Sequence, residues 1–365
     1  MPQNKKIKVL CVVGARPNFI KIAPLFKEFK KYPKIKPILI HTGQHYDYKM
    51  SGAFFKELNI PKPNYNLGIR AGLHGEQTGK TMIEFEKVCL KEKPDLIIVV
   101  GDVNATLAGA LVAAKLHIPV AHIEAGLRSG DMTMPEEINR ILTDHISDIL
   151  FCPTQTAVKN LKKENIIKNV YNTGDLMYDV FSKNIKIAQK KSKILKILDL
   201  KPKTYCLLTI HRASNVDNLE NLKKILEAIQ KSNEKVIFPI HPRTQKQLKK
   251  LKLKIVNCKL KIIAPVGYLD MLWLEKNAKK ILTDSGGVQK EAYFAKTPCI
   301  TLRDTIEWIE TLKYGWNILV GSDKKKIIKA IRFFNPKKKQ INCFGNGKTA
   351  EKIVKNILNK LLKKK

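Results

Sequence analysis

DLIIVVG at residues 95–101, NATLAGALVAAKLH at 104–117 and PVAHIEAG at 119–126 follow one another closely along the chain. The first and third segments are short apolar runs that end in glycine, which is typical of strands buried on both faces of a parallel sheet. The segment between them is rich in alanine and leucine, which favours a helix. A strand, a helix and a second strand in this order predict a parallel sheet covered by helices.

The same alternation continues on both sides of these segments, and it predicts further strands at 8–14, 37–43, 204–212, 235–242, 260–265 and 279–284. We therefore predict an α/β fold with two Rossmann-like domains that face a cleft. The predicted domains are 1–175 and 204–345, joined by a basic linker at 176–203.

The remaining residues, 346–365, predict a basic amphipathic helix. We expect this helix to pack back on the body of the protein, although a membrane surface is the alternative. The residues of its predicted apolar face are Ile353, Val354, Ile357, Leu358, Leu361 and Leu362.

The composition excludes several classes of protein. The chain has 365 residues, 44% of them hydrophobic, and no apolar run reaches the roughly 20 residues that span a bilayer. The N-terminus lacks a signal-peptide layout, so we expect a cytoplasmic protein without stable membrane association. The seven cysteines never form C-x-x-C and the histidines show no metal-ligand spacing, so we predict neither disulfides nor a metal.

The net charge of +36 raises the question of nucleic-acid binding. Only eight of the 68 basic residues are arginines, however, and aromatic residues make up 7% of the chain. Nucleic-acid surfaces rely on arginine and on aromatic stacking, so we predict a solvated lysine surface and no nucleic-acid partner. Against this background an arginine indicates a position that needs a planar guanidinium. Six of the eight lie in the motifs below: Arg16, Arg128, Arg140, Arg212, Arg243 and Arg303.

LTDSGGVQKEA at 282–292 predicts an anion site. A strand ends at Asp284, two glycines free the backbone, and we expect a helix from about Val288 whose amides and positive end attract phosphate. The alternative is an ordinary strand-to-helix turn with an aspartate or serine cap. The candidate ligands here are Ser285, Gly286, Gly287 and Glu291. IHPRT at 240–244 adds His241 and Arg243 at another strand end, which favours a nucleotide diphosphate.

The first half supplies carboxylates near the ends of its strands. Asp102 follows one predicted strand, Glu124 lies at the end of the next, and Glu136 begins a helix. Asp102 and Glu136 could also be ordinary acids at helix N-termini. Together the three predict a cleft that exchanges protons at carbon. The other charged residues predicted to line it are Arg16, Lys21, His211 and Arg212.

Two nucleotide-binding signatures are incomplete. GLHGEQTGKT at 72–81 resembles a P-loop, but His74 stands where that motif needs glycine and no strand precedes it. No G-x-G-x-x-G follows the first strand. We therefore predict neither an ATP site nor a nicotinamide or other cofactor.

Taken in order, GARPNFIKIAPL, TGQHYD, the block from Gly101 to Thr154, TIHRASN, PIHPRT, LTDSGGVQKEA and LRDTIEW resemble the non-hydrolysing UDP-N-acetylglucosamine 2-epimerase family. The resemblance runs through nearly the whole chain. It implies the glycosyltransferase-B type of fold, a homodimer and a UDP-sugar substrate. It also implies reversible epimerisation at carbon 2, giving UDP-N-acetylmannosamine, by anti elimination of UDP, a glycal-type intermediate and re-addition.

By position in the motifs, the resemblance also implies roles for individual residues. The acid/base groups would be Asp102, Glu124 and Glu136. The residues close to the reacting sugar or supporting charge in the cleft would be His211, Lys21 and Arg212. The residues that hold UDP would be Arg16, His241, Ser285, Gly286, Gly287 and Glu291.

Some positions depart from the family pattern. Many members carry Arg-Pro where this chain has Trp308 and Ile309. In this the chain is similar to relatives that epimerise UDP-2,3-diacetamido-2,3-dideoxyglucuronate, which is therefore an alternative substrate. Gln44 and His45 match part of an activator site of some bacterial members, but Tyr46 stands where a basic residue is expected. A UDP-sugar glycosyltransferase and a hydrolysing epimerase are the alternative enzymes.

Overall fold

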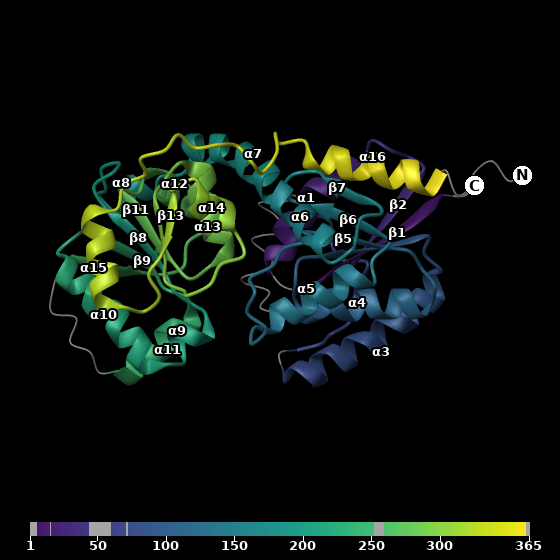
Figure 1. The fold of residues 1–365 in the computed structure, drawn as a ribbon, viewed down its shortest axis with the longest axis horizontal. Coiled ribbons are helices and arrows are strands. Elements are labelled where there is room, and N and C mark those ends of the chain that lie inside the picture. Colours follow the sequence, from purple (N-terminus) through teal and green to yellow (C-terminus); the bar gives the residue numbers. More distant parts are fainter. Residues whose placement is uncertain (1–5, 15, 44–59, 71, 252–258, 363–365) are drawn as a thin grey trace, which may run out of the picture. The chain divides into compact units, whose positions relative to one another are not determined.

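Two parallel sheets organise the chain, one in each of two structural units (Figure 1). The first unit comprises Met1–Val180 and Asn342–Lys365, and the second comprises Phe181–Ile341. This computed structural model describes residues 6–14, 16–43, 60–70, 72–251 and 259–362, with the backbone alone at residues 16 and 17.

The first unit holds a seven-stranded sheet in the order β3-β2-β1-β4-β5-β6-β7, in which the described strands pair in parallel. Its strands are β1 (Ile7–Val13), β2 (Ile35–His41), β3 (Tyr65–Asn66), β4 (Leu96–Val100), β5 (Val120–Ile123), β6 (Ile149–Cys152) and β7 (Val170–Asn172). Its helices are α1 (Arg16–Phe29), α3 (His74–Glu92), α4 (Asn104–Lys115), α5 (Pro135–His145), α6 (Gln155–Lys163), the start of α7 (Leu176–Lys191) and α16 (Thr349–Leu362). The strand order reverses between β1 and β4, and doubly wound sheets bind ligands beyond the carboxyl ends of the strands at such a point.

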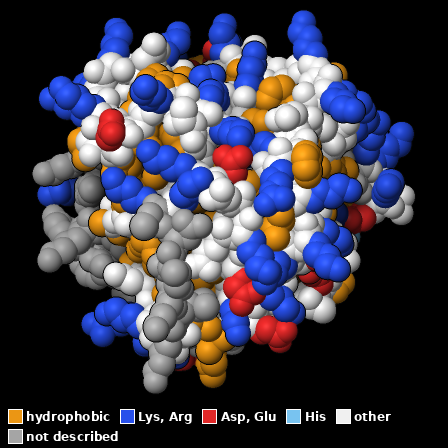
Figure 2. Space-filling view, turned by 90° about the vertical axis from the view of Figure 1, so that its left-hand side faces the viewer, with side chains coloured by type: hydrophobic (Ala, Val, Ile, Leu, Met, Phe, Trp, Pro, Cys, Tyr) orange, Lys and Arg blue, Asp and Glu red, His pale blue; other side chains and the backbone are white. Residues whose placement is uncertain are grey.

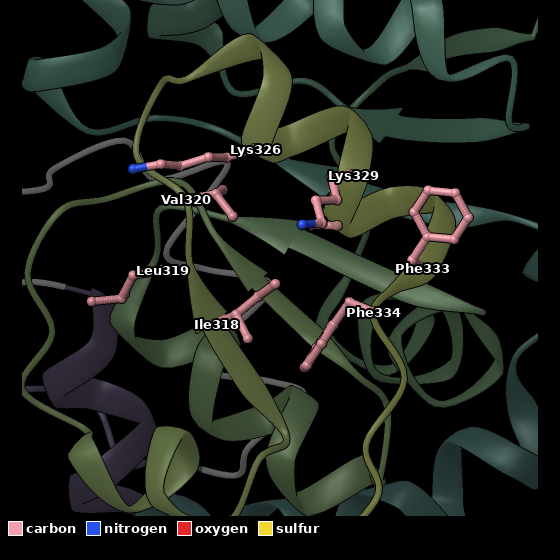
Figure 3. Close-up of a pocket in the computed structure, with 8 residues that line it drawn as sticks. Ile318, Leu319, Val320, Lys326, Lys329, Phe333 and Phe334 are labelled. Carbon is pink, nitrogen blue, oxygen red and sulfur yellow. The ribbon is translucent and has the colours of Figure 1, made fainter.

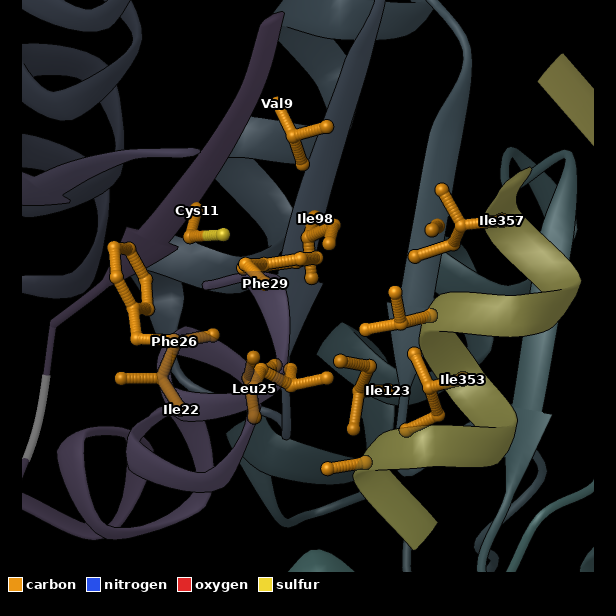
Figure 4. Close-up of a cluster of buried hydrophobic side chains, with 14 of the residues drawn as sticks. Val9, Cys11, Ile22, Leu25, Phe26, Phe29, Ile98, Ile123, Ile353 and Ile357 are labelled. Carbon is orange, nitrogen blue, oxygen red and sulfur yellow. The ribbon is translucent and has the colours of Figure 1, made fainter. Parts of the chain in front are cut away.

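Helices cover both faces of this sheet because side chains of a strand alternate between its faces. On β1, Val9 and Cys11 pack into the cluster that α1 and α16 complete, whereas Leu10 and Val12 pack against α3 and α4. Figure 4 shows the first of these clusters, in which side chains of α1 and α16 meet those of the central strands. The central strands are thus buried on both faces, as their continuous apolar sequences predict.

The helix α16 completes the core of the first unit, although it follows the second unit in the chain. Three of its apolar side chains are fully buried: Ile353, Val354 and Ile357. The backbone N–H of Ala350 donates to Asp179 Oδ2 at 3.0 Å, which fastens the start of α16 to α7. The prediction of the apolar face is wrong for one residue, Leu362, which is 51% exposed at the end of the helix.

The second unit holds a six-stranded sheet in the order β10-β9-β8-β11-β12-β13, also parallel. Its strands are β8 (Cys206–Thr209), β9 (Val236–Pro239), β10 (Leu260–Ile263), β11 (Lys280–Thr283), β12 (Cys299–Thr301) and β13 (Asn317–Leu319). Its helices are α8 (Ile194–Ile197), α9 (Ala213–Val216), α10 (Leu219–Ser232), α11 (Pro242–Leu251), α12 (Tyr268–Asn277), α13 (Gly286–Ala295), α14 (Ile309–Lys313) and α15 (Lys324–Phe333). The order reverses here between β8 and β11, so both units have the Rossmann-like arrangement that the sequence predicts.

The structure contains helices and strands that the sequence did not predict. The segment 176–203, predicted as a linker, contains the helices α7 and α8. The strands β3, β6, β7, β12 and β13 were not predicted. Four of them, β3, β7, β12 and β13, are only two or three residues long and give little periodic signal. None of the described helices is long and apolar enough to cross a bilayer.

Candidate functional site

The polar side chains of the first unit converge on Gly101, directly after β4. Gly101 has a φ of +72°, and a Cβ there would lie 3.4 Å from Lys21 Nζ and 3.5 Å from Glu124 Oε2. The Asn18 amide would lie 3.3 Å from the same point. Glycine fits this position because it accepts the left-handed backbone and leaves space for the surrounding polar groups. Residues from α1 and from the ends of β4 and β5 therefore meet at the point where the strand order reverses.

Asp102 is a partly accessible carboxylate of this group, with 31% of its side chain exposed. Its Oδ2 accepts a hydrogen bond of 2.6 Å from Arg140 Nη1. Loss of hydration raises the pKa of Asp102 above its ordinary value; Arg140 and Lys21 oppose this shift, and the nearby carboxylates Glu124 and Glu136 add to it. A carboxylate with a raised pKa is well suited to take up and return a proton.

Arg140 is 1% exposed and joins Asp102 to Glu137 of the same helix. Glu137 also accepts hydrogen bonds from the backbone N–H groups of Ser129 (2.9 Å) and Gly130 (2.8 Å). Burial would raise the pKa of Glu137, but these N–H donors and Arg140 outweigh it and lower the pKa. Glu137 thus holds the loop before α5 in place, while its neighbour Glu136 is half-buried in the first turn of α5.

Glu124 and Lys21 form a buried ion pair, in which Lys21 Nζ donates to Glu124 Oε2. Their side chains are 6% and 9% exposed. The backbone of Glu124 has a φ of +72°, unusual for a residue with a side chain. Such strain costs on the order of 1–3 kcal/mol and is often found at functional sites. Here it turns the carboxylate at the end of β5 toward Lys21.

Three asparagines of this site were not predicted from the sequence. Asn18 donates to the Val100 carbonyl at 2.9 Å, and Asn139 donates to the Asp102 carbonyl at 2.9 Å. Asn104, at the start of α4, lies within hydrogen-bond distance of Asn139. They fix the backbone around Asp102. Their position inside the motifs could have indicated a role in the site, since a polar residue buried there needs a hydrogen-bond partner.

In the second unit, Asp284 follows β11 and binds the loop that follows the neighbouring strand β8. Asp284 is fully buried, and its carboxylate accepts hydrogen bonds from the backbone N–H groups of His211 (3.1 Å) and Arg212 (3.0 Å). The amide of Asn215 donates to it at 3.1 Å. The rings of His211 and His241 lie 5.6 Å apart. The ends of β8, β9 and β11 therefore bring these predicted residues together.

The predicted anion site lies at the start of α13, with one correction. The helix begins at Gly286 rather than at about Val288, because Ser285 takes the N-cap position with extended backbone. Neither cap alternative holds: the Ser285 side chain makes no capping hydrogen bond, and Asp284 binds the loop after β8. The first turn of a ten-residue helix has N–H groups without partners within the helix, and a positive dipole end, which suit a phosphate.

Glu291, 6% exposed, lies farther along α13 and accepts a hydrogen bond of 3.1 Å from the Tyr268 hydroxyl. Beside it, Glu275 is fully buried, and among the described residues its carboxyl oxygens have no hydrogen-bond partner. Burial raises the pKa of Glu275 well above its ordinary value, and the charge of Glu291 adds to this effect. Glu275 was not predicted, and nothing in its sequence surroundings distinguishes it.

Several predicted residues lie apart from these groups. Arg243 forms an exposed ion pair with Asp217, with Nε 3.2 Å from Oδ1. The side chain of Arg16 and the residues Gln44, His45 and Tyr46 lie outside what the structure describes.

A hollow of about 330 Å³ lies on the second unit between β13 and α15 (Figure 3). It is lined by Ile318, Leu319, Val320, Lys326, Lys329, Ala330, Phe333 and Phe334. None of the predicted site residues belongs to it, and its apolar lining does not suit a nucleotide sugar.

The comparisons with known proteins agree over nearly the full chain. A model of the UDP-N-acetylglucosamine 2-epimerase family matches residues 27–358. A UDP-N-acetylglucosamine 2-epimerase homolog from Methanococcus maripaludis is 56% identical over 97% of this chain and 100% of its own length. The UDP-2,3-diacetamido-2,3-dideoxy-D-glucuronate 2-epimerase of Pseudomonas aeruginosa is 47% identical over 89% of this chain and 92% of its own.

A solved structure gives the same result for the fold. The UDP-GlcNAc 2-epimerase of Methanocaldococcus jannaschii, in complex with UDP-GlcNAc and UDP, has a TM-score of 0.90 and 52% identity, and covers 97% of this chain and 99% of that chain. These matches include both units and the helix α16. The chain belongs to the UDP-N-acetylglucosamine 2-epimerase family.

Proposed function

We propose that this enzyme interconverts UDP-N-acetylglucosamine and UDP-N-acetylmannosamine by inverting carbon 2, without a nicotinamide or metal. The observation that carries the proposal is the convergence of Asp102, Glu124 and Lys21 around Gly101, within a family named for this reaction. A relative that was solved in complex with UDP-GlcNAc and UDP supports a UDP-linked N-acetylhexosamine as the substrate.

In the proposed mechanism, a carboxylate removes the proton from carbon 2 while the bond between carbon 1 and UDP breaks on the opposite face. The electron pair of the broken C–H bond forms a double bond between carbons 1 and 2, and UDP takes the electrons of the bond that breaks. A proton then returns to carbon 2 from the opposite face as UDP adds back to carbon 1. The acid/base groups are Asp102, Glu124 and Glu136, and Lys21 and Arg212 support the charge.

The second unit holds the nucleotide in this proposal. The diphosphate binds at the free N–H groups of α13, where Ser285, Gly286 and Gly287 lie, and the ribose hydroxyls donate to Glu291. His211 lies next to the sugar. The remaining proposed UDP ligands are Arg16, His241 and Arg243.

The alternative substrate is a UDP-diacetamido-glucuronate, on which the Pseudomonas aeruginosa relative acts by name. In favour of it, Trp308 replaces an arginine of many members, and the ammonium of Lys290 lies 3.9 Å from the centroid of its indole ring. A uronate would favour a cation near carbon 6, but Lys290 is only 1% exposed and does not supply it.

The test is proton NMR of the purified protein with UDP-N-acetylglucosamine in deuterated water, without added nicotinamide or metal. UDP-N-acetylmannosamine with deuterium at carbon 2 is the expected product. Turnover of the diacetamido-uronate alone would favour the alternative substrate, and free N-acetylmannosamine would indicate a hydrolysing enzyme. Transfer of the sugar to an acceptor without any epimer would instead indicate a glycosyltransferase.

A homodimer in the cytoplasm is part of the same proposal. Light scattering after size-exclusion chromatography tests the oligomeric state, and a monomer with full activity would contradict it.

A further inference from the structure

His122 is a fully buried side chain that the proposed mechanism does not use. It lies on β5, and both of its ring nitrogens have close oxygen partners. Nδ1 lies 2.7 Å from Asp144 Oδ1, and Nε2 lies 2.8 Å from the carbonyl oxygen of Gly101. Both distances are those of good hydrogen bonds.

Both oxygen partners are acceptors. The Gly101 carbonyl carries no hydrogen. The second oxygen of Asp144 accepts hydrogen bonds from the Gly126 N–H (3.0 Å) and from Arg128 Nη1 (2.7 Å). The guanidinium of Arg128 is always charged and pairs with Asp144, so this group is a carboxylate whatever the charge of His122. A carboxylate and a carbonyl each need a donor.

A neutral imidazole has one N–H group and therefore satisfies only one of these acceptors. The other ring nitrogen would then direct its lone pair at an oxygen lone pair inside the core. Only the doubly protonated ring donates on both sides. Its positive charge is balanced by Asp144, whose own second partner, Arg128, is paired with Glu164 at 2.7 Å.

We propose that His122 is a buried imidazolium that positions the candidate acid/base groups of the first unit relative to one another. One ring joins three elements. It lies on β5, two residues before Glu124; its Nε2 holds the carbonyl of Gly101, directly before Asp102; and its Nδ1 holds Asp144 of α5, the helix that carries Glu136. His122 touches no substrate in this role, so it is a positioning residue.

The charge strengthens these links. Hydrogen bonds from an ionised donor are shorter and roughly twice as strong as those between neutral groups. Gly101 lies in a left-handed turn, and its N–H is held by the Ile123 carbonyl at 2.9 Å. With its N–H held by Ile123 and its carbonyl held by His122, Gly101 is fixed on both sides directly before Asp102.

The protonation state is tested by nitrogen NMR of the whole protein labelled with 15N-histidine, near neutral pH and without substrate. The His122 signals are assigned by their loss in His122→Gln. We expect both ring nitrogens of His122 to have the chemical shifts of protonated nitrogens. One nitrogen with the shift of an unprotonated imidazole would overturn the proposal, since the proton would then lie on Asp144 or one contact would not be a hydrogen bond.

The positioning role is tested by the kinetics of His122→Gln, with His145→Gln as the matched control. Glutamine cannot donate to both acceptors in the geometry of the ring, whereas His145 is exposed at the end of α5. We expect kcat of His122→Gln to fall roughly 10- to 100-fold, the usual effect of a small misplacement of catalytic groups, with KM changed much less. His145→Gln should behave as the wild type.

An unchanged kcat in folded His122→Gln would contradict the positioning role, and circular dichroism establishes that the variant is folded. If the variant does not fold, the wild-type spectrum still decides the protonation state, and Asp144→Asn replaces it in the kinetic test. The roles of the carboxylates rest on the proposed function. A wild-type protein without epimerase activity but with an imidazolium at His122 would refute that function and leave the charged ring established.

Discussion

Asp102 and Glu124 have different surroundings, and the difference separates catalytic from structural effects. Asp102 is partly exposed, and its partner Arg140 keeps a second carboxylate, Glu137, when Asp102 is changed. Glu124 is buried and forms an ion pair with Lys21. Removal of either negative charge should affect the rate, but only removal of the buried one should affect folding.

We therefore predict that Asp102→Asn and Glu124→Gln each lower kcat by roughly 100-fold or more, as expected for a positioned acid or base. Asp102→Asn should change the free energy of unfolding by less than about 1 kcal/mol. Glu124→Gln should lower it by about 1–3 kcal/mol, because the buried ammonium of Lys21 loses its counter-charge. Steady-state kinetics and urea unfolding measure both effects. Near-wild-type activity in either variant removes that residue from the catalytic group.

Glu275 predicts a pH dependence of stability. Its pKa in the folded protein is well above the value of about 4.3 for an unfolded chain, so folding takes up a proton between the two values. The contribution of Glu275 to the free energy of unfolding is fully present below about pH 4. It is lost as the pH rises toward the folded pKa, at up to about 1.4 kcal/mol per pH unit.

Glu275→Gln removes this proton uptake. The variant and the wild type should be equally stable near pH 4, and the variant should become the more stable of the two as the pH rises. Thermal unfolding of both proteins across this pH range is the measurement. A difference that stays constant with pH would mean that Glu275 is ionised in the folded protein.

At the scale of elements, the strand ends were predictable and many of their contacts were not. Asp102 and Glu124 follow apolar runs, and the carboxyl ends of parallel strands are where polar residues gather. Asn139 donates a hydrogen bond to a residue 37 positions away, and Asp284 accepts one from a residue 73 positions away. Such pairings depend on tertiary structure, which a single sequence does not reveal. The start of α13 was misplaced by two residues because glycine gives no propensity signal for a helix.

The helix α16 allows a test of packing within one element. Ile357 is fully buried in the core of the first unit, whereas Leu362 on the same helix is 51% exposed. Ile357→Ala should lower the free energy of unfolding by about 2–5 kcal/mol, the range for a large-to-small change in a core. Leu362→Ala should change it by less than about 0.5 kcal/mol. Denaturant unfolding compares them, and equal effects would show that α16 is not docked as described.

At the scale of the whole molecule, the net charge is +36. Figure 2 shows Lys and Arg side chains scattered among other residues over much of the described part of one face, where they form no single basic stripe. Repulsion among so many like charges destabilises a folded chain, and salt screens it. A dispersed charge also gives nucleic acid no defined track to bind.

We predict that the melting temperature rises when sodium chloride is increased from about 0.02 M to about 0.5 M, because the screening length falls from roughly 20 Å to roughly 4 Å. An uncharged osmolyte at equal osmolarity is the control for solvent effects. Filter binding with tRNA at physiological salt should detect no complex. A falling melting temperature, or tight RNA binding, would contradict the assignment of these lysines to a solvated surface.

The chain leaves the first unit at Val180 and returns to it at Asn342. During synthesis, the part of the first sheet that α16 covers therefore emerges from the ribosome long before α16 is made. The second unit is one continuous segment. Its synthesis starts after that of the first unit but ends before the last segment of the first unit is made. At about 5–20 residues per second the open face waits on the order of ten seconds. Nascent chains of this protein should thus depend on chaperones through their first half, and the unit that is translated second should be the first to complete its fold.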